Sequence, residues 1–133
     1  MGVFSLNYNI RDRHYEIATS EQESVLIVKF TSMDIGGMYE IADSLKKIAD
    51  YVEERMPMYT IFDFNTVSFF SSRLLGALVD LRNKTDYFNG EIMVAGLNPQ
   101  LYRVFKITCL DQLFSFFPDT DHALAEIRMT GRR

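Results

Sequence analysis

Apolar and polar residues alternate along the chain in two different rhythms, and each rhythm predicts one type of element. Short apolar runs, several of them rich in β-branched residues, predict strands at residues 14–18, 25–30, 59–64, 91–96 and 112–117. Apolar residues spaced three and four apart predict helices at residues 38–53, 72–87, 98–108 and 119–127. The expected order of elements is therefore β-β-α-β-α-β-α-β-α.

The clearest periodic pattern lies between the second and third expected strands. It begins at Met38 and ends near Val52, before Pro57, with apolar residues on one side and charged residues on the other. This pattern predicts an amphipathic helix of about four turns. Ile41 and Leu45 lie in the middle of the apolar stripe, so we expect both side chains to be buried against the sheet.

The beginnings of the last two helices are predicted by capping chemistry. Asn98 is suited to accept the free N–H groups of a first turn, and Pro99 at the first helical position needs no donor. Asp119 and Thr120 are expected to cap the final helix in the same way.

The order of elements predicts the fold class. Strands that alternate with helices imply right-handed crossovers and a sheet covered by helices, and the initial hairpin makes that sheet mixed. We therefore expect a single α/β domain at residues 14–129, with about five strands and about four helices. Residues 1–13 would form an extension whose apolar residues indicate an extra strand, and residues 130–133 a tail.

Composition and charge then exclude several classes of protein. With 47% hydrophobic and 24% charged residues, the chain is unlike a disordered segment. A net charge of -4 argues against a general nucleic-acid binder. The charged residues 11–13 are unlike a signal peptide, and no apolar run is long enough to span a membrane. We expect a soluble, cytoplasmic protein that binds neither nucleic acid nor membrane.

Residues that carry catalysis or bind metal ions are sparse. His14, in an expected edge strand, and His122, in the first turn of the last helix, are expected to be surface residues. Cys109 is expected to be a small buried hydrophobe. Gly36-Gly37 precedes a helix but lacks the spacing of a phosphate-binding loop. We therefore expect no enzymatic activity, no metal ion and no cofactor.

Two adjacent serines, Ser71 and Ser72, stand where the second predicted helix begins. One interpretation is structural, because serine is a favoured helix cap. The other is that one serine is a phosphorylation acceptor, since a phosphate there would face backbone N–H groups and the positive end of the helix dipole. The residues themselves leave both interpretations open.

The segment around these serines carries a family pattern. That pattern is an apolar strand with Asp, then Val-x-Phe-x, then Asp-Ser-Ser-Gly, then a helix with Leu-Gly-x-x-Leu. The residues that fit it are Asp63, Val67, Phe69, Leu75, Gly76, Ala77 and Leu78. Residues 89–99, 109–114 and 122–124 fit later motifs of the same family. From about residue 14 to residue 127 the chain resembles the STAS family, the sulfate-transporter and anti-sigma-factor-antagonist domains.

The chain departs from the family pattern at the Asp-Ser-Ser-Gly motif. An ungapped placement puts Ser72 at the phosphorylatable serine, while Ser71 replaces the Asp, Arg73 the second Ser and Leu74 the Gly. In antagonists of this family, a partner kinase phosphorylates that serine, and the dephosphorylated form binds the kinase and frees a sigma factor. The resemblance thus implies Ser72 as the acceptor, with Ser71 as the cap and second choice.

The resemblance also implies a partner and a surface that binds it. The partner would be a serine-kinase anti-sigma factor or another regulatory protein, and a homodimer stays open. The implied binding residues are Asp34, Phe70, Ser71, Ser72, Arg73, Leu74 and Leu75. Arg73 adds bulk and charge where such partners dock. The alternative is a STAS module that is not phosphorylated and that scaffolds, interacts or senses, in which these serines only cap the helix.

Overall fold

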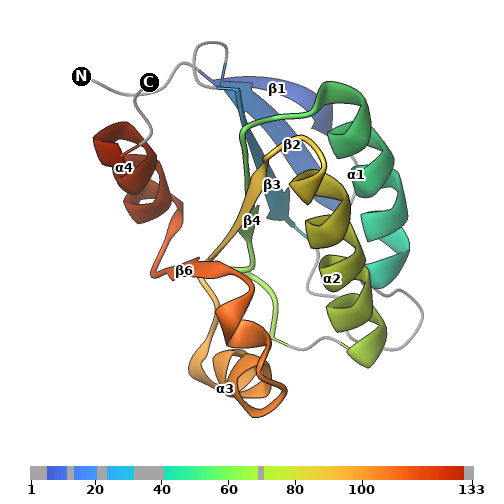
Figure 1. Cartoon of the computed structure of the whole chain (residues 1–133), viewed down its shortest axis with the longest axis vertical. Coiled ribbons are helices and arrows are strands. Elements are labelled where there is room, and N and C mark those ends of the chain that lie inside the picture. The colour runs from blue at the N-terminus through green and yellow to red at the C-terminus, as the bar shows by residue number, and fades with distance from the viewer. Residues whose placement is uncertain (1–5, 12–13, 21–23, 32–40, 69–70, 131–133) are drawn as a thin grey trace.

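The computed structural model describes residues 6–11, 14–20, 24–31, 41–68 and 71–130, with only the backbone described at 6–9, 11 and 41–43 (Figure 1). Its elements, in chain order, are β1 (Leu6–Arg11), β2 (Tyr15–Ser20), β3 (Val25–Phe30), α1 (Ile41–Arg55), β4 (Tyr59–Asp63), α2 (Ser72–Asp86), β5 (Glu91–Ala95), α3 (Pro99–Ile107), the short 3-10 helix η1 (Leu110–Gln112), β6 (Ser115–Phe117) and α4 (Thr120–Thr130). The predicted α/β domain with a mixed sheet and four helices is confirmed.

The sheet has six strands in the order β1-β2-β3-β4-β5-β6. The first three strands pair in antiparallel fashion, and β3 to β6 pair in parallel. The additional strand, β1, lies within the N-terminal segment and pairs with β2. β2 is therefore an interior strand, and the expectation that His14 lies in an edge strand is wrong: His14 is half-buried and directly precedes β2.

Helices cover both faces of this sheet. Figure 1 shows α1 and α2 side by side on one face and α4 on the other. The larger core lies under α1 and α2, and the smaller core lies between α4 and the opposite face of the central strands. Leu45 in α1 is 1% exposed, so the predicted apolar face is confirmed there. The side chain of Ile41 lies outside the described part of the chain.

The two predicted helix caps are confirmed. The Asn98 side chain accepts the N–H of Leu101 at 2.8 Å, with Pro99 at the first position of α3. The Asp119 carboxylate accepts the N–H of His122 at 2.8 Å at the beginning of α4. Both bonds satisfy first-turn donors that have no partner within the helix.

The chain between α3 and α4 differs from its prediction. The expected strand at residues 112–117 is only Ser115–Phe117, because η1 and a turn precede it. Cys109 enters this turn with a left-handed φ of 64°. Its side chain is exposed, so the expectation that Cys109 is buried is wrong.

Candidate functional site

The candidate site lies beyond the carboxyl end of β4, where the chain turns into α2. In open parallel sheets this edge is the usual place for a binding site, because the loops that leave the strands gather there. Asp63 is the last residue of β4, and Ser72 is the first residue of α2. The described part of the connecting loop is residues 64–68 and 71.

Asp63 holds the first half of this loop. One carboxylate oxygen, Oδ1, accepts the backbone N–H of Asn65 at 2.9 Å. The other, Oδ2, accepts the hydroxyl of Thr120 at 3.2 Å. Since Thr120 begins α4, this carboxylate joins the loop to the helix on the opposite face of the sheet. The sequence pattern identified Asp63 as a motif residue but gave no indication of its link to Thr120.

Hydrogen bonds to backbone carbonyls fix the same loop against the neighbouring strands. The N–H of Phe64 donates to the carbonyl of Ala95 at 2.9 Å, and the hydroxyl of Thr66 donates to the carbonyl of Phe30 at 2.6 Å. Gly96 has a φ of +75°, and a Cβ there would lie 3.1 Å from the backbone nitrogen of Asn65. Gly96 therefore permits the close approach that keeps the loop next to β5.

Ser71 occupies the N-cap position of α2. Its backbone is extended, with φ -91° and ψ 170°, and its carbonyl accepts the N–H of Leu74 at 3.0 Å. Its side chain makes no capping hydrogen bond. The predicted cap position is therefore observed, while the hydroxyl does not play the capping role expected of it.

The implied binding residues differ in how they are placed. Ser72 and Arg73 are exposed, and Ser71 and Leu75 are half-buried. Leu74 is 0% exposed, so its side chain supports α2 from below and contributes nothing to the outer surface. Asp34 and Phe70 lie outside the described residues.

The first turn of α2 stands on a packed base. Leu74, Leu78 and Leu81 are all buried in the main core, and α2 packs along α1. A helix of fifteen residues aligns its peptide dipoles and places a partial positive charge at its beginning. No acidic residue lies in this first turn. The site thus combines an exposed serine hydroxyl with the positive end of a well-supported helix.

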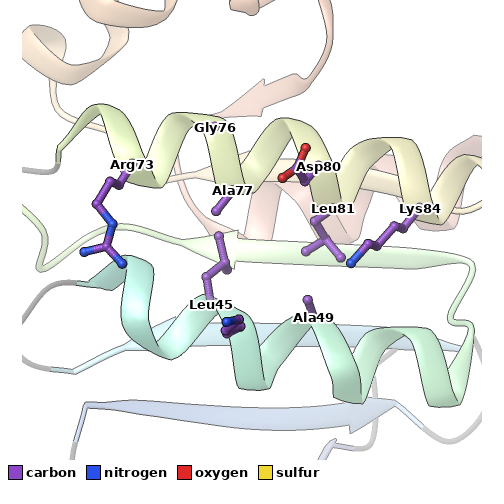
Figure 2. Close-up of a pocket in the computed structure, with 9 residues that line it drawn as sticks. Leu45, Ala49, Arg73, Gly76, Ala77, Asp80, Leu81 and Lys84 are labelled. Carbon is purple, nitrogen blue, oxygen red and sulfur yellow. The ribbon is translucent and has the colours of Figure 1, made fainter.

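A groove runs between α1 and α2 and begins at Arg73 (Figure 2). Its volume is about 600 Å³, and its lining residues are Leu45, Lys46, Ala49, Arg73, Gly76, Ala77, Asp80, Leu81 and Lys84. Figure 2 shows that Arg73 projects from α2 toward the beginning of α1. Nothing in the predicted elements indicated this groove; the small residues Ala49, Gly76 and Ala77 that line it were the available signal.

Lys84 forms an ion pair, and His122 a close polar contact, near helix ends. Lys84 contacts Glu53 of α1 at 3.0 Å, and this hydrogen bond, followed by the charge of Glu53, raises the pKa of Lys84 above its usual value. At the beginning of α4, His122 Nδ1 lies 2.7 Å from Asp119 Oδ1, and hydrogen bonds from His122 lower the pKa of the Asp119 carboxyl. Neither pair includes Ser71 or Ser72.

Two features are absent from the part of the chain that the structure describes. There, no group of three or more His, Cys, Asp or Glu side chains is arranged to hold a metal ion. Likewise, none of the described helices has the length and apolar character needed to cross a membrane.

The fold is shared with several solved structures. An anti-sigma factor antagonist from Mycobacterium paratuberculosis matches with a TM-score of 0.65 and 22% identity, over 93% of this chain and 95% of that one. A sulfate transporter family protein from Wolinella succinogenes matches with a TM-score of 0.66 and 21% identity, over 80% and 86% of the two chains. The phosphorylated form of the Bacillus cell fate determinant SpoIIAA matches with a TM-score of 0.59 and 12% identity, over 94% and 99%.

Because these identities are low, the structural matches establish the fold and nothing more. The sequence shows the family, because the family model of the STAS domain matches residues 16–123, which is most of the chain. The fold shared with the similar structures agrees with this match of the sequence. The chain belongs to the STAS domain family.

Proposed function

We propose that this protein is a partner-switching regulator of the anti-sigma-factor-antagonist type. It binds a serine-kinase anti-sigma factor, or a regulatory protein of similar design, through the surface at the beginning of α2. Ser72 is the phosphorylation acceptor, and Ser71 is the second choice. The protein itself carries out no chemistry in this proposal, since the kinase supplies ATP and the catalytic groups.

The position of Ser72 is the observation that carries the proposal. Its side chain is exposed at the first residue of α2, while Leu74, two residues later, is fully buried. A kinase can therefore reach the hydroxyl without unfolding the helix. A phosphate at this place would be stabilised by backbone N–H groups and by the helix dipole.

Phosphorylation would change this surface mainly through charge. A phosphoserine adds about -1.5 to -2 charges at neutral pH. The domain beneath the site is closely packed, so we expect the modification to alter the contact with the partner while the fold stays unchanged. The anti-sigma factor antagonist and the phosphorylated SpoIIAA among the similar structures favour this class of function.

A second candidate function is a STAS module that is not phosphorylated and serves as a scaffold or sensor. The changed neighbours of Ser72 favour it. Under the ungapped placement, Leu74 stands where the family has Gly, and its side chain is fully buried. Arg73 stands where the family has a second serine, and it is larger, charged and exposed.

Phosphorylation in vitro distinguishes the two candidates. The purified protein is incubated with ATP and with a histidine-kinase-like ATPase encoded beside its gene, and the phosphate is located by mass spectrometry. We expect one phosphate on Ser72, which Ser72→Ala removes and the matched control Ser71→Ala retains. Phosphorylation of another substrate shows that the ATPase is an active kinase. Absence of phosphate from both serines under those conditions would favour the scaffold.

A further inference from the structure

We propose that this protein associates with a second copy of itself through an apolar patch at the end of α2 opposite to Ser72. The patch consists of Met56, Met58 and Tyr87. In the dimer the patch of one copy packs on the same patch of the other copy about a twofold axis. The proposal is independent of the proposed function, because it uses none of the residues around Ser72.

The ends of α1 and α2 bring two of these side chains together. The two helices run in the same direction (Figure 2), and Lys84 of α2 contacts Glu53 of α1 at 3.0 Å. Tyr87 and Met56 each follow this contact by three residues, which is nearly one helical turn. Tyr87 and Met56 are therefore neighbours at the ends of the two helices.

Met58 lies where the loops that follow α1 and α2 meet. Its carbonyl accepts the N–H of Glu91 at 2.9 Å. Close by, a Cβ placed on Gly90 would lie only 2.9 Å from the carbonyl oxygen of Pro57. The two loops are thus in direct contact, and the three apolar side chains form one continuous patch.

The side chains of the patch are open to solvent. Tyr87 is 92% exposed, Met56 57% and Met58 50%. Tyrosine and methionine are enriched at protein interfaces, and the flexible methionine side chain adapts well to an apposed surface. Large apolar side chains that are exposed together indicate an interface, whereas single ones are ordinary surface.

Met56 also occupies a backbone position that favours glycine. Its φ is 49°, and its N–H donates to the carbonyl of Val52 at 2.8 Å, which is the bond of a left-handed helix end. A side chain in this conformation destabilises the fold relative to glycine. Since more than half of the Met56 side chain is exposed, contacts within the domain offset only part of this cost. A contact with a second copy accounts for a methionine at this position.

The charges that border the patch favour a second copy as the occupant. Arg55 directly precedes Met56, and its guanidinium lies 4.9 Å from the centre of the Tyr51 ring. Asp86 directly precedes Tyr87. Both are exposed, and neither forms an ion pair with another residue that the structure describes. A border with both signs of charge is complementary to itself under a twofold axis, because Arg55 of each copy can meet Asp86 of the other.

Such a dimer leaves both phosphorylation acceptors accessible. Ser72 is the first residue of α2 and Tyr87 follows its last, so roughly 20 Å of helix separates the two. The dimer would therefore present two copies of the surface at the beginning of α2.

Sedimentation velocity over a series of protein concentrations tests the self-association. We expect a dimer that dissociates on dilution, because a patch of three side chains makes a small interface. Met58→Lys should weaken the dimer by about tenfold or more, since two lysines would face each other across the axis. Met129→Lys is the matched control: Met129 is 78% exposed on α4, and its replacement should leave the dimer unchanged.

Met56→Gly separates a role in binding from a role in the fold. At a concentration where the wild type is monomeric, the glycine variant should have a higher melting temperature, because the left-handed position no longer carries a side chain. At high concentration the same variant should dimerise more weakly. A lower melting temperature of the monomer would show that Met56 serves the fold, and would contradict the proposal.

Mixing two charge variants tests the twofold arrangement. Arg55→Glu and Asp86→Lys should each weaken self-association by roughly fivefold, because each places like charges opposite one another. An equimolar mixture of the two variants should associate like the wild type, because opposite charges meet again in the mixed dimer. Circular dichroism checks that every variant is folded.

Three further outcomes would overturn the proposal: a monomer at every concentration, a folded Met58→Lys variant that dimerises like the wild type, or a mixture no stronger than its components. No kinase and no phosphate enters these measurements. Their failure would therefore leave the proposed function as it stands, and a protein without phosphate on either serine could still dimerise.

Discussion

Helices α2 and α3 both follow a parallel strand, but their first turns are capped in different ways. At α3 the Asn98 side chain accepts the N–H of Leu101, and Pro99 fills a position that needs no donor. At α2 the Ser71 backbone has cap geometry, yet its side chain makes no capping bond. The side chain at the N-cap therefore contributes a capping hydrogen bond at α3 and contributes none at α2.

The largest expected effect concerns the base on which α2 stands. Leu74→Ala should lower the free energy of unfolding by about 2–5 kcal/mol, because it removes a fully buried side chain and leaves a cavity. Chemical denaturation measures this change. Leu75→Ala, at a half-buried position, is the control and should cost clearly less. Equal costs would show that Leu74 does not anchor the first turn.

The next prediction tests the two caps directly. Asn98→Ala should lower the free energy of unfolding by about 0.5–2 kcal/mol, since the Leu101 N–H loses its acceptor. Ser71→Ala should cost less than Asn98→Ala, because its side chain makes no capping hydrogen bond. Urea denaturation of both variants gives the comparison. If Ser71→Ala cost as much as Asn98→Ala, the contrast between the two helices would be removed.

The C-terminal end of α3 offers a gain in stability. Cys109→Gly should raise the free energy of unfolding by about 0.5–1 kcal/mol, since glycine adopts a left-handed backbone without the steric cost of a side chain. Thermal unfolding under reducing conditions is the measurement. Cys109→Ala is the control and should give little change. A loss of stability in the glycine variant would mean that the exposed thiol makes a contact worth more than the strain.

The smallest effect sharpens the view of α2 as an anion-accepting end. Ser72→Asp should raise the free energy of unfolding by about 0.3–1 kcal/mol at low salt, because a carboxylate interacts favourably with the positive end of a helix. Ser72→Asn is the uncharged control. Thermal unfolding at low and high ionic strength shows whether the difference is screened. A destabilised Asp variant would contradict the electrostatic description of this site.

Much of the fold could be predicted because it follows from local chemistry. The period of α1 indicated which face would carry Leu45, and the side chains of Asn98 and Asp119 indicated where two helices begin. The first residue of α2 was also placed correctly at Ser72. These features depend on residues close together in the chain.

Features that depend on distant residues were missed. The pairing of β1 with β2 decides that β2 is interior, and the hydroxyl of Thr120 reaches Asp63 from far along the chain. The groove arises from the register of α1 against α2, which brings Leu45 next to Ala77. A periodic pattern defines one face of a helix, but it does not specify which residues of another helix that face will meet.

The central claim, that Ser72 controls partner binding, is tested most directly by one affinity measurement. Isothermal titration calorimetry compares the partner kinase binding to the unmodified protein and to the protein carrying phosphate on Ser72, with Ser72→Ala as the unmodifiable control. We expect phosphorylation to weaken binding by about 5- to 150-fold, the usual range of regulatory coupling, and Ser72→Ala to bind like the unmodified protein. Equal affinities of the phosphorylated and unmodified proteins would contradict the claim.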